Sequence, residues 1–156
     1  MKEAAKITGN SSNNPGGGVF IADTGTFTMQ DDASVTNNNS TDAYNGGGGV
    51  YNAGTMIMKD NAIVSGNTAE VGGGVSNAGI FMMEGGTIAN NTATIAGGEV
   101  LNYNYGYTMI LNATVQAGIY FNTTISNAYA TGPQIYSEPG SPFEDGDGSP
   151  IVPDTY

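Results

Sequence analysis

The sequence predicts an all-β fold, a parallel β-helix in which short strands repeat coil after coil. Three observations predict it. Gly-rich stretches that end in Val recur along the chain, a short stretch rich in Met and Phe follows each of them, and a third apolar element follows in turn. The valines that close the Gly-rich stretches are Val19, Val50, Val75 and Val100, spaced by 31, 25 and 25 residues. Residue types that match at such steps indicate stacked coils about 4.8 Å apart.

The alternation within each element predicts which side chains face the core, because successive residues of a strand point to opposite faces. We expect the four valines above to form one inward column. The Met and Phe element predicts two further inward columns, Phe27, Met56, Phe81 and Met109, and Met29, Met58, Met83 and Leu111. The third element predicts a last column, Val35, Val64, Ile88 and Val115.

The repeats set the expected domain organisation. We expect five to six coils of three short strands over residues 1–136, with an irregular coil or an insertion at 116–131. Residues 137–156 hold four of the six prolines and several carboxylates, so we interpret them as an acidic cap, linker or tail, since Pro interrupts strand pairing. The first apolar element, at Ile7, has no partner elements before it, so we expect the chain to be a fragment.

Asparagines recur in the same register as the apolar residues. Asn52, Asn77 and Asn102 are spaced by 25 and 25 residues. Stacked amide side chains can hydrogen-bond from coil to coil, so we expect these three to form a structural ladder.

Composition and charge exclude several function classes. The chain has 156 residues, 3 Lys, no Arg, 14 Asp and Glu, and a net charge of −11. Binding to nucleic acid needs clustered cations, so we expect no nucleic-acid partner. The absence of Cys and His removes thiolate and imidazole chemistry. The sequence contains no run of 18 apolar residues, so we expect no membrane insertion.

The repeats resemble those of bacterial surface β-helix proteins. The residues that carry the resemblance are Gly47-Gly48-Gly49-Val50-Tyr51-Asn52 followed by Val64-Ser65-Gly66-Asn67, and Gly132-Pro133-Gln134-Ile135-Tyr136 repeats the first motif. They are similar to the repeats of the polymorphic outer-membrane protein family and of adhesin-like proteins, over roughly residues 7–136. The resemblance implies a right-handed helix and an extracellular or cell-surface location, with a signal peptide outside this chain.

Enzymatic chemistry is the alternative that the sequence leaves open. Many parallel β-helices act on polysaccharides, and paired carboxylates can hydrolyse a glycoside. Asp31 and Asp60 are 29 residues apart, so we expect them to be vertical neighbours, with Asp32 beside them. Turn chemistry is the preferred interpretation of these residues, and we name no catalytic residue.

Two further hypotheses find little support in the sequence. The acidic stretch 144–149 alternates carboxylates, yet Pro150 stands where a calcium-binding loop of the EF-hand type needs Gly. We therefore predict no metal and no cofactor. Ice binding needs a regular outward Thr array, and the array ends after Thr26-Phe27-Thr28.

The outward columns give the candidate contact residues. Phe20, Ile57, Met82 and Ile110 would face outward, which suggests a protein interface or self-association. Tyr51, Tyr103, Tyr105 and Tyr107 could stack on sugar rings, so we predict them as a glycan-binding surface. Unpaired strand edges at the ends of the coil stack are a second route to self-association, as fibres. We expect a non-enzymatic, adhesin-like surface module that offers a rigid scaffold to a glycan or a surface protein.

Overall fold

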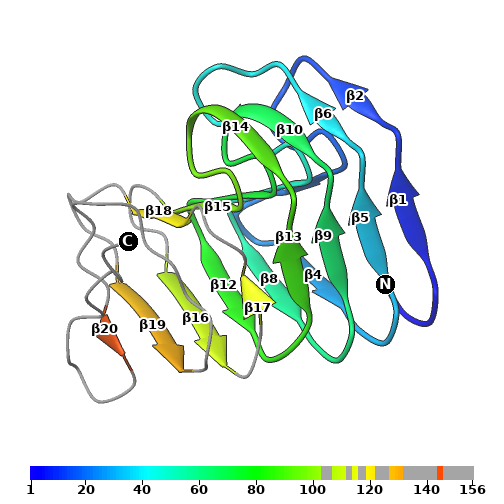
Figure 1. Ribbon diagram of the computed structural model, residues 1–156, viewed down its shortest axis with the longest axis vertical. Coiled ribbons are helices and arrows are strands. Elements are labelled where there is room, and N and C mark those ends of the chain that lie inside the picture. The colour runs from blue at the N-terminus through cyan, green and yellow to red at the C-terminus, as the bar shows by residue number, and fades with distance from the viewer. Residues whose placement is uncertain (103–106, 112–113, 116–118, 122–126, 132–143, 146–156) are drawn as a thin grey trace.

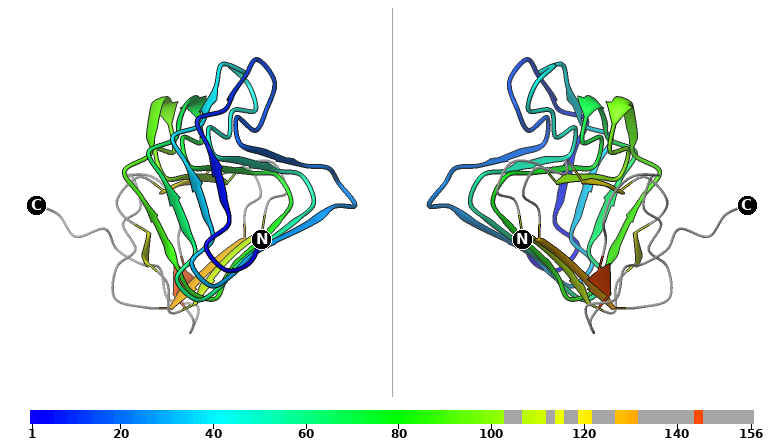
Figure 2. Two further views of the ribbon diagram at one scale, coloured as in Figure 1. Left: turned by 90° about the vertical axis from the view of Figure 1, so that its right-hand side faces the viewer. Right: turned by 90° about the vertical axis from the view of Figure 1, so that its left-hand side faces the viewer.

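The computed structural model describes residues 1–102, 107–111, 114–115, 119–121, 127–131 and 144–145. In this part of the chain every regular element is a strand, and every strand pairing is parallel. The strands stack as a β-solenoid of about four turns, against the five to six predicted. Figure 1 shows the coils side by side from β1 to β20, and Figure 2 looks along the stack, where successive coils overlie one another.

The strands form four sheets, which we call A to D, and each of the first four coils contributes one strand to every sheet. Sheet A contains β1 (Lys6–Thr8), β5 (Ser34–Thr36), β9 (Ile63–Ser65), β13 (Thr87–Ala89) and β17 (Thr114–Val115). Sheet B contains β2 (Ser11–Ser12), β6 (Asn39–Ser40), β10 (Thr68–Val71) and β14 (Thr92–Ala96). Sheet C contains β3 (Val19–Ile21), β7 (Val50–Asn52), β11 (Val75–Asn77), β15 (Val100–Asn102) and β18 (Ile119–Phe121). Sheet D contains β4 (Thr26–Met29), β8 (Thr55–Met58), β12 (Ile80–Met83), β16 (Tyr107–Leu111), β19 (Asn127–Thr131) and β20 (Glu144–Asp145).

The prediction of three strands per coil is wrong, because sheet B is an additional layer. Between sheets A and B the chain turns at one residue with positive φ, namely Gly9, Asn37, Gly66 or Asn90 in successive coils. Gly and Asn adopt this left-handed conformation at little cost, so the turn takes very few residues. The segment after it then continues as a further strand, which the repeat of three elements does not include.

The predicted inward columns form the core. Val50, Val75 and Val100 lie in register in sheet C and are fully buried, and Val19 packs against the same cluster. The sheet A column behaves as predicted. Its four members are in register and fully buried, namely Val35, Val64, Ile88 and Val115. Met29, Met56, Met58 and Met83 of sheet D are fully buried in the same core, so side chains from three sheets fill the interior.

The register of β16 differs from the prediction by one residue. Phe81 pairs with Thr108, and Met83 pairs with Ile110. The segment Tyr107–Leu111 is apolar on both faces, so its alternation does not fix the register. Thr108 is buried and donates its hydroxyl to Asn102 Oδ1 at 2.9 Å. This hydrogen bond favours Thr108 as the inward residue, and Met109, the residue predicted for that column, is in register with Met82 instead.

The last part of the chain extends the same stack where it is described. In the predicted irregular segment 116–131, β18 pairs with β15 and β19 with β16, both in parallel register. Of the predicted tail 137–156, residues 144–145 pair with β19 as β20. The remaining residues of both segments lie outside the described residues. No helix in the described part is long and apolar enough to span a membrane.

Candidate functional site

The candidate site is an aromatic pair on the outer face of sheet C. Phe20 on β3 and Tyr51 on β7 occupy the same register position of adjacent coils. Their ring centroids are 5.3 Å apart and the rings are inclined by only 15°, so the two side chains stack. Phe20 is 57% exposed, which is unusual for a residue of this size in a folded chain. Tyr51 is half-buried, so most of the ring surface that the pair presents to solvent belongs to Phe20.

The other two residues of this outward column are not part of the solvent-exposed aromatic surface. Ser76 and Leu101 are in register with Tyr51, as predicted, but both are buried. The turn glycines of their coils lie against them. A Cβ placed on Gly72 would come within 2.7 Å of Ser76 Cβ, and one on Gly97 within 2.8 Å of Leu101 Cβ. The aromatic surface is thus confined to the first two coils.

The predicted tyrosine cluster is only partly described. Tyr51 stacks with Phe20 in sheet C, whereas Tyr107 opens β16 in sheet D and is half-buried. The structure therefore does not bring these two tyrosines together. Tyr103 and Tyr105 lie outside the described residues.

The predicted apolar interface is divided, and one of its members is wrong. Ile57 and Met82 are register neighbours on sheet D, and both are half-buried. Ile110 is fully buried in the core beneath Met83, because of the one-residue register shift in β16. Phe20 belongs to the aromatic pair on sheet C. Ile80, 45% exposed, and Tyr107 adjoin Ile57 and Met82 on the outer face of sheet D.

Asp31 and Asp60 are vertical neighbours, as predicted, and both hold corners of the coil. Each has positive φ, 58° and 55°. The Asp31 backbone N–H donates to Asp60 Oδ2 at 3.1 Å, and the Glu3 N–H donates to Asp31 Oδ2 at 2.9 Å. Asp32 Oδ1 accepts a hydrogen bond from Asn61 Nδ2 at 3.2 Å. These carboxylates therefore satisfy backbone and side-chain donors of the turn between sheets D and A.

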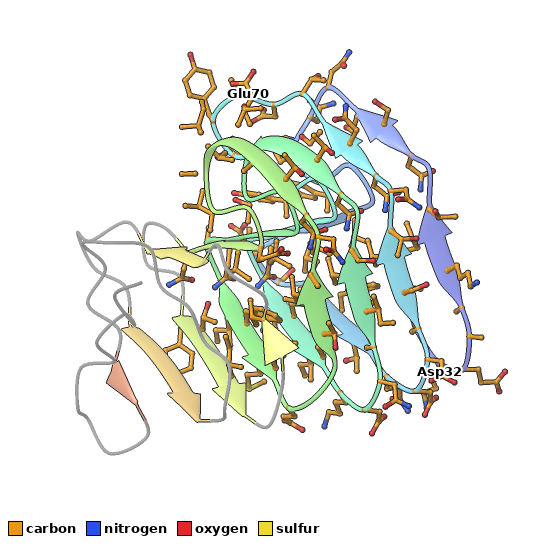
Figure 3. The ribbon with its side chains drawn as sticks, viewed as in Figure 1. Asp32 and Glu70 are labelled. Carbon is orange, nitrogen blue, oxygen red and sulfur yellow. The ribbon has the colours of Figure 1, made fainter. Side chains whose placement is uncertain are left out.

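Charge is spread over the corners of the coils. Figure 3 shows Asp32 at the corner between sheets D and A and Glu70 at the far end of the molecule, on sheet B. Lys59 forms an ion pair with Glu84 at 2.8 Å, and the hydrogen bond and charge of Glu84 raise the pKa of Lys59. Within the described residues, no three His, Cys, Asp or Glu side chains lie close enough to hold a metal ion.

Two amide ladders run through the interior beside the site. The predicted one, which we call the C–D ladder, links Asn52 Nδ2 to Asn77 Oδ1 at 2.7 Å and Asn77 Nδ2 to Asn102 Oδ1 at 2.6 Å. The second, the A–B ladder, was not predicted. It follows the turn between sheets A and B and consists of Asn10, Asn38, Asn67 and Asn91. Its signal was present, because an Asn stands three residues after each of the first four inward residues of sheet A, Ile7, Val35, Val64 and Ile88.

The ladders and the parallel sheets fix the position of the aromatic pair. Asn52 follows Tyr51 directly, and its buried side-chain amide also donates to Ile80 O at 2.8 Å. The backbone of β7 is thereby tied both to the next coil and to sheet D. Comparison with protein-family models, with curated proteins and with solved structures gives no match for this chain.

Proposed function

We propose that this chain is a non-enzymatic scaffold module of a cell surface or the extracellular space, which contacts glycans through Phe20 and Tyr51. The single observation that carries the proposal is the stacked pair on the outer face of sheet C, in which Phe20 is exposed and Tyr51 is half-buried. Aromatic side chains offer large apolar faces with a polar handle in Tyr, and such faces can pack against the apolar C–H faces of sugar rings.

The scaffold role rests on the regularity of the stack. Parallel pairing continues through all four sheets, and buried amides cross-link successive coils. Backbone groups that are paired on both sides leave few local motions open. A surface residue on such a sheet is held in place before a ligand arrives, which lowers the entropy lost on binding.

The charge distribution favours a neutral glycan. The outward column of sheet C, from Phe20 to Leu101, contains no charged residue. The chain as a whole carries −11, which repels polyanionic ligands. Recognition by aromatic stacking and hydrogen bonds suits an uncharged polysaccharide better than a sulfated or uronate-rich one.

The hydrogen bonds that the corner carboxylates already accept support a non-catalytic role. Asp31 and Asp60, the residues that the hydrolase alternative needs, already accept hydrogen bonds from backbone N–H groups in left-handed corners. A surface location is supported by the resemblance of the repeats to those of bacterial surface proteins.

The test is a glycan-array screen of the purified chain, with and without Ca²⁺, followed by affinity measurements on any glycan captured. Phe20→Ala and Tyr51→Ala should each weaken binding about tenfold or more, with an unchanged circular dichroism spectrum. Tyr44→Ala is the matched control, because Tyr44 is 87% exposed and lies in a turn, outside the strands that carry the aromatic pair. Capture that is insensitive to both substitutions, or equally sensitive to Tyr44→Ala, would contradict the proposal.

A blank array would point instead to a spacer or self-assembling role. Sedimentation at increasing concentration then separates the two. Association that Ile80→Ser or Met82→Ser weakens would place a protein contact on sheet D.

A further inference from the structure

The A–B ladder ends at a carboxylate. Asn10, Asn38 and Asn67 each donate Nδ2 to Oδ1 of the next asparagine, at 2.9–3.0 Å. Asn91 is the last asparagine, and its Nδ2 donates to Glu99 Oε2 at 2.6 Å. The Asn91 backbone N–H also donates to both Glu99 oxygens, at 3.3 Å. Glu99 thus accepts the two donors that the next asparagine Oδ1 accepts in the earlier coils.

Glu99 stands in a position that is glycine in the other coils. Gly18, Gly49 and Gly74 occupy the equivalent place directly before the inward valine. A Cβ on any of them would come within 2.9 Å of the amide nitrogen of a ladder asparagine one coil further on. Three residues after Val115, where the earlier repeats have Asn, the sequence has Gly118. We call the positions of Gly18, Gly49, Gly74 and Glu99 the glycine column. Glu99 therefore replaces a glycine of this column in the coil before the one that lacks a ladder asparagine.

The carboxylate is buried and has no cation to pair with. Glu99 is 4% exposed. The only cations of the side chains are Lys2, Lys6 and Lys59, of which the first two lie in the first coil and Lys59 is paired with Glu84. Around Glu99, strands β13, β14 and β15 carry no charged residue, and β10 carries only Glu70. In the described part, the groups that donate to the Glu99 carboxylate are the backbone N–H groups of Asn90 and Asn91 and the side-chain amide of Asn91.

We propose that Glu99 is a pH-sensitive terminator of the A–B ladder. It supplies the acceptor that a fifth asparagine would supply, and its buried negative charge weakens the fourth coil at neutral pH. The ladder therefore stops at a defined coil, and the stability of that coil rises when the carboxylate takes up a proton.

The direction of the pH dependence follows from the surroundings of the Glu99 carboxyl. Burial raises the pKa of Glu99, and the hydrogen bonds from Asn91 and Asn90 oppose this only in part. A carboxyl with a raised pKa in the folded chain holds its proton at a pH where the unfolded chain has lost it. The stability that this carboxyl contributes is therefore lost as pH rises from its pKa in the unfolded chain through its pKa in the folded chain.

The test compares the full chain with Glu99→Gln in urea denaturation between about pH 4 and pH 8. Glutamine keeps the shape and the acceptor oxygen but does not titrate. We expect the midpoint of the wild type to fall relative to that of Glu99→Gln as pH rises, so that the two curves diverge toward neutral pH. The control is Glu70→Gln, the same change on a half-exposed side chain, whose midpoint should stay parallel to the wild type. Parallel curves for Glu99→Gln would overturn the proposal.

Two further measurements do not depend on that variant. Carbon-detected NMR of the Glu99 carboxyl should give a titration midpoint above that of glutamate in an unfolded peptide, and an ordinary midpoint would contradict the proposal. Glu99→Gly restores the glycine column but leaves the Asn91 N–H groups without their acceptor, so it should lower the denaturation midpoint. A midpoint equal to or above that of the wild type would show that Glu99 does not serve the ladder.

Discussion

Asn67 donates its side-chain amide to Asn91 Oδ1 at 2.9 Å, although the two residues are 24 positions apart. The same oxygen accepts the Asn67 backbone N–H, also at 2.9 Å, and Asn67 Nδ2 donates to Val35 O at 3.0 Å. One buried amide therefore links three successive coils. Because Asn67 is fully buried, none of these groups can turn to water instead.

Removing one rung should destabilise the whole stack. Asn67→Ala removes the acceptor of the Asn38 backbone and side-chain N–H groups, and the side-chain donor to Asn91 Oδ1 and Val35 O, which should lower the free energy of unfolding by about 3 kcal/mol. Urea denaturation measures the loss. The control is Asn39→Ala, where a half-exposed amide makes one long contact of 3.5 Å to Ser11, and this change should have little effect. Equal losses would show that the ladder does not stabilise the fold.

The two faces of β12 should respond differently to truncation. Phe81 is fully buried between Met56 and Thr108, so Phe81→Ala should cost about 3–5 kcal/mol through lost burial and the cavity left behind. Met82, the next residue, faces outward and is half-buried, so Met82→Ala should cost far less. Thermal unfolding of the pair measures the difference. Similar melting temperatures would mean that the inward register of sheet D is wrong.

The glycine column should not accept a methyl group. A Cβ on Gly49 would lie 2.6 Å from Gly74 O and 2.9 Å from Asn67 Nδ2, so Gly49→Ala should force the coils apart, with a loss of about 3 kcal/mol. Gly9→Asn is the contrasting change. A Cβ on Gly9 would meet no atom within 4 Å, and Asn37 and Asn90 hold the same left-handed corner in other coils. Denaturation midpoints should fall for the first variant and stay near the wild type for the second.

The corner aspartates should tolerate loss of charge. Asparagine can accept the same backbone hydrogen bonds and adopts positive φ readily, so Asp31→Asn with Asp60→Asn should change stability by less than about 1 kcal/mol. We expect no release of reducing sugar by the wild type from a panel of polysaccharides. Turnover by the wild type that the double variant abolishes would establish the hydrolase alternative and contradict the non-enzymatic proposal.

The sequence predicts most of the core because stacked coils repeat their residue types. The valine column of sheet C and the Val35 column of sheet A follow directly from spacing. Sheet B was not predicted, because its first two strands have only two residues each and its strands follow those of sheet A after a turn at one left-handed residue, such as Asn37, Gly66 or Asn90. The register of β16 was not predicted either, since it depends on a hydrogen bond from Thr108 and not on hydrophobicity.

The candidate site was predicted in part. Phe20 and Tyr51 were both singled out, though for different roles, and their register follows from the 31-residue spacing of the valines before them. That Ser76 and Leu101 are buried could not be inferred, because it depends on how the turns at Gly72 and Gly97 fold over them. Glu99 carried a visible signal, as the one residue that interrupts the glycine column.

The central claim is that buried amides tie the coils into one rigid scaffold, and exchange of side-chain amide protons tests it most directly. NMR hydrogen exchange should find the Nδ2 protons of Asn52, Asn67, Asn77 and Asn91 protected to the level of global unfolding. The Nδ2 protons of Asn61, whose contact to Asp32 is exposed, should exchange rapidly and serve as the internal reference. Ladder protons that exchange as fast as those of Asn61 would contradict the account.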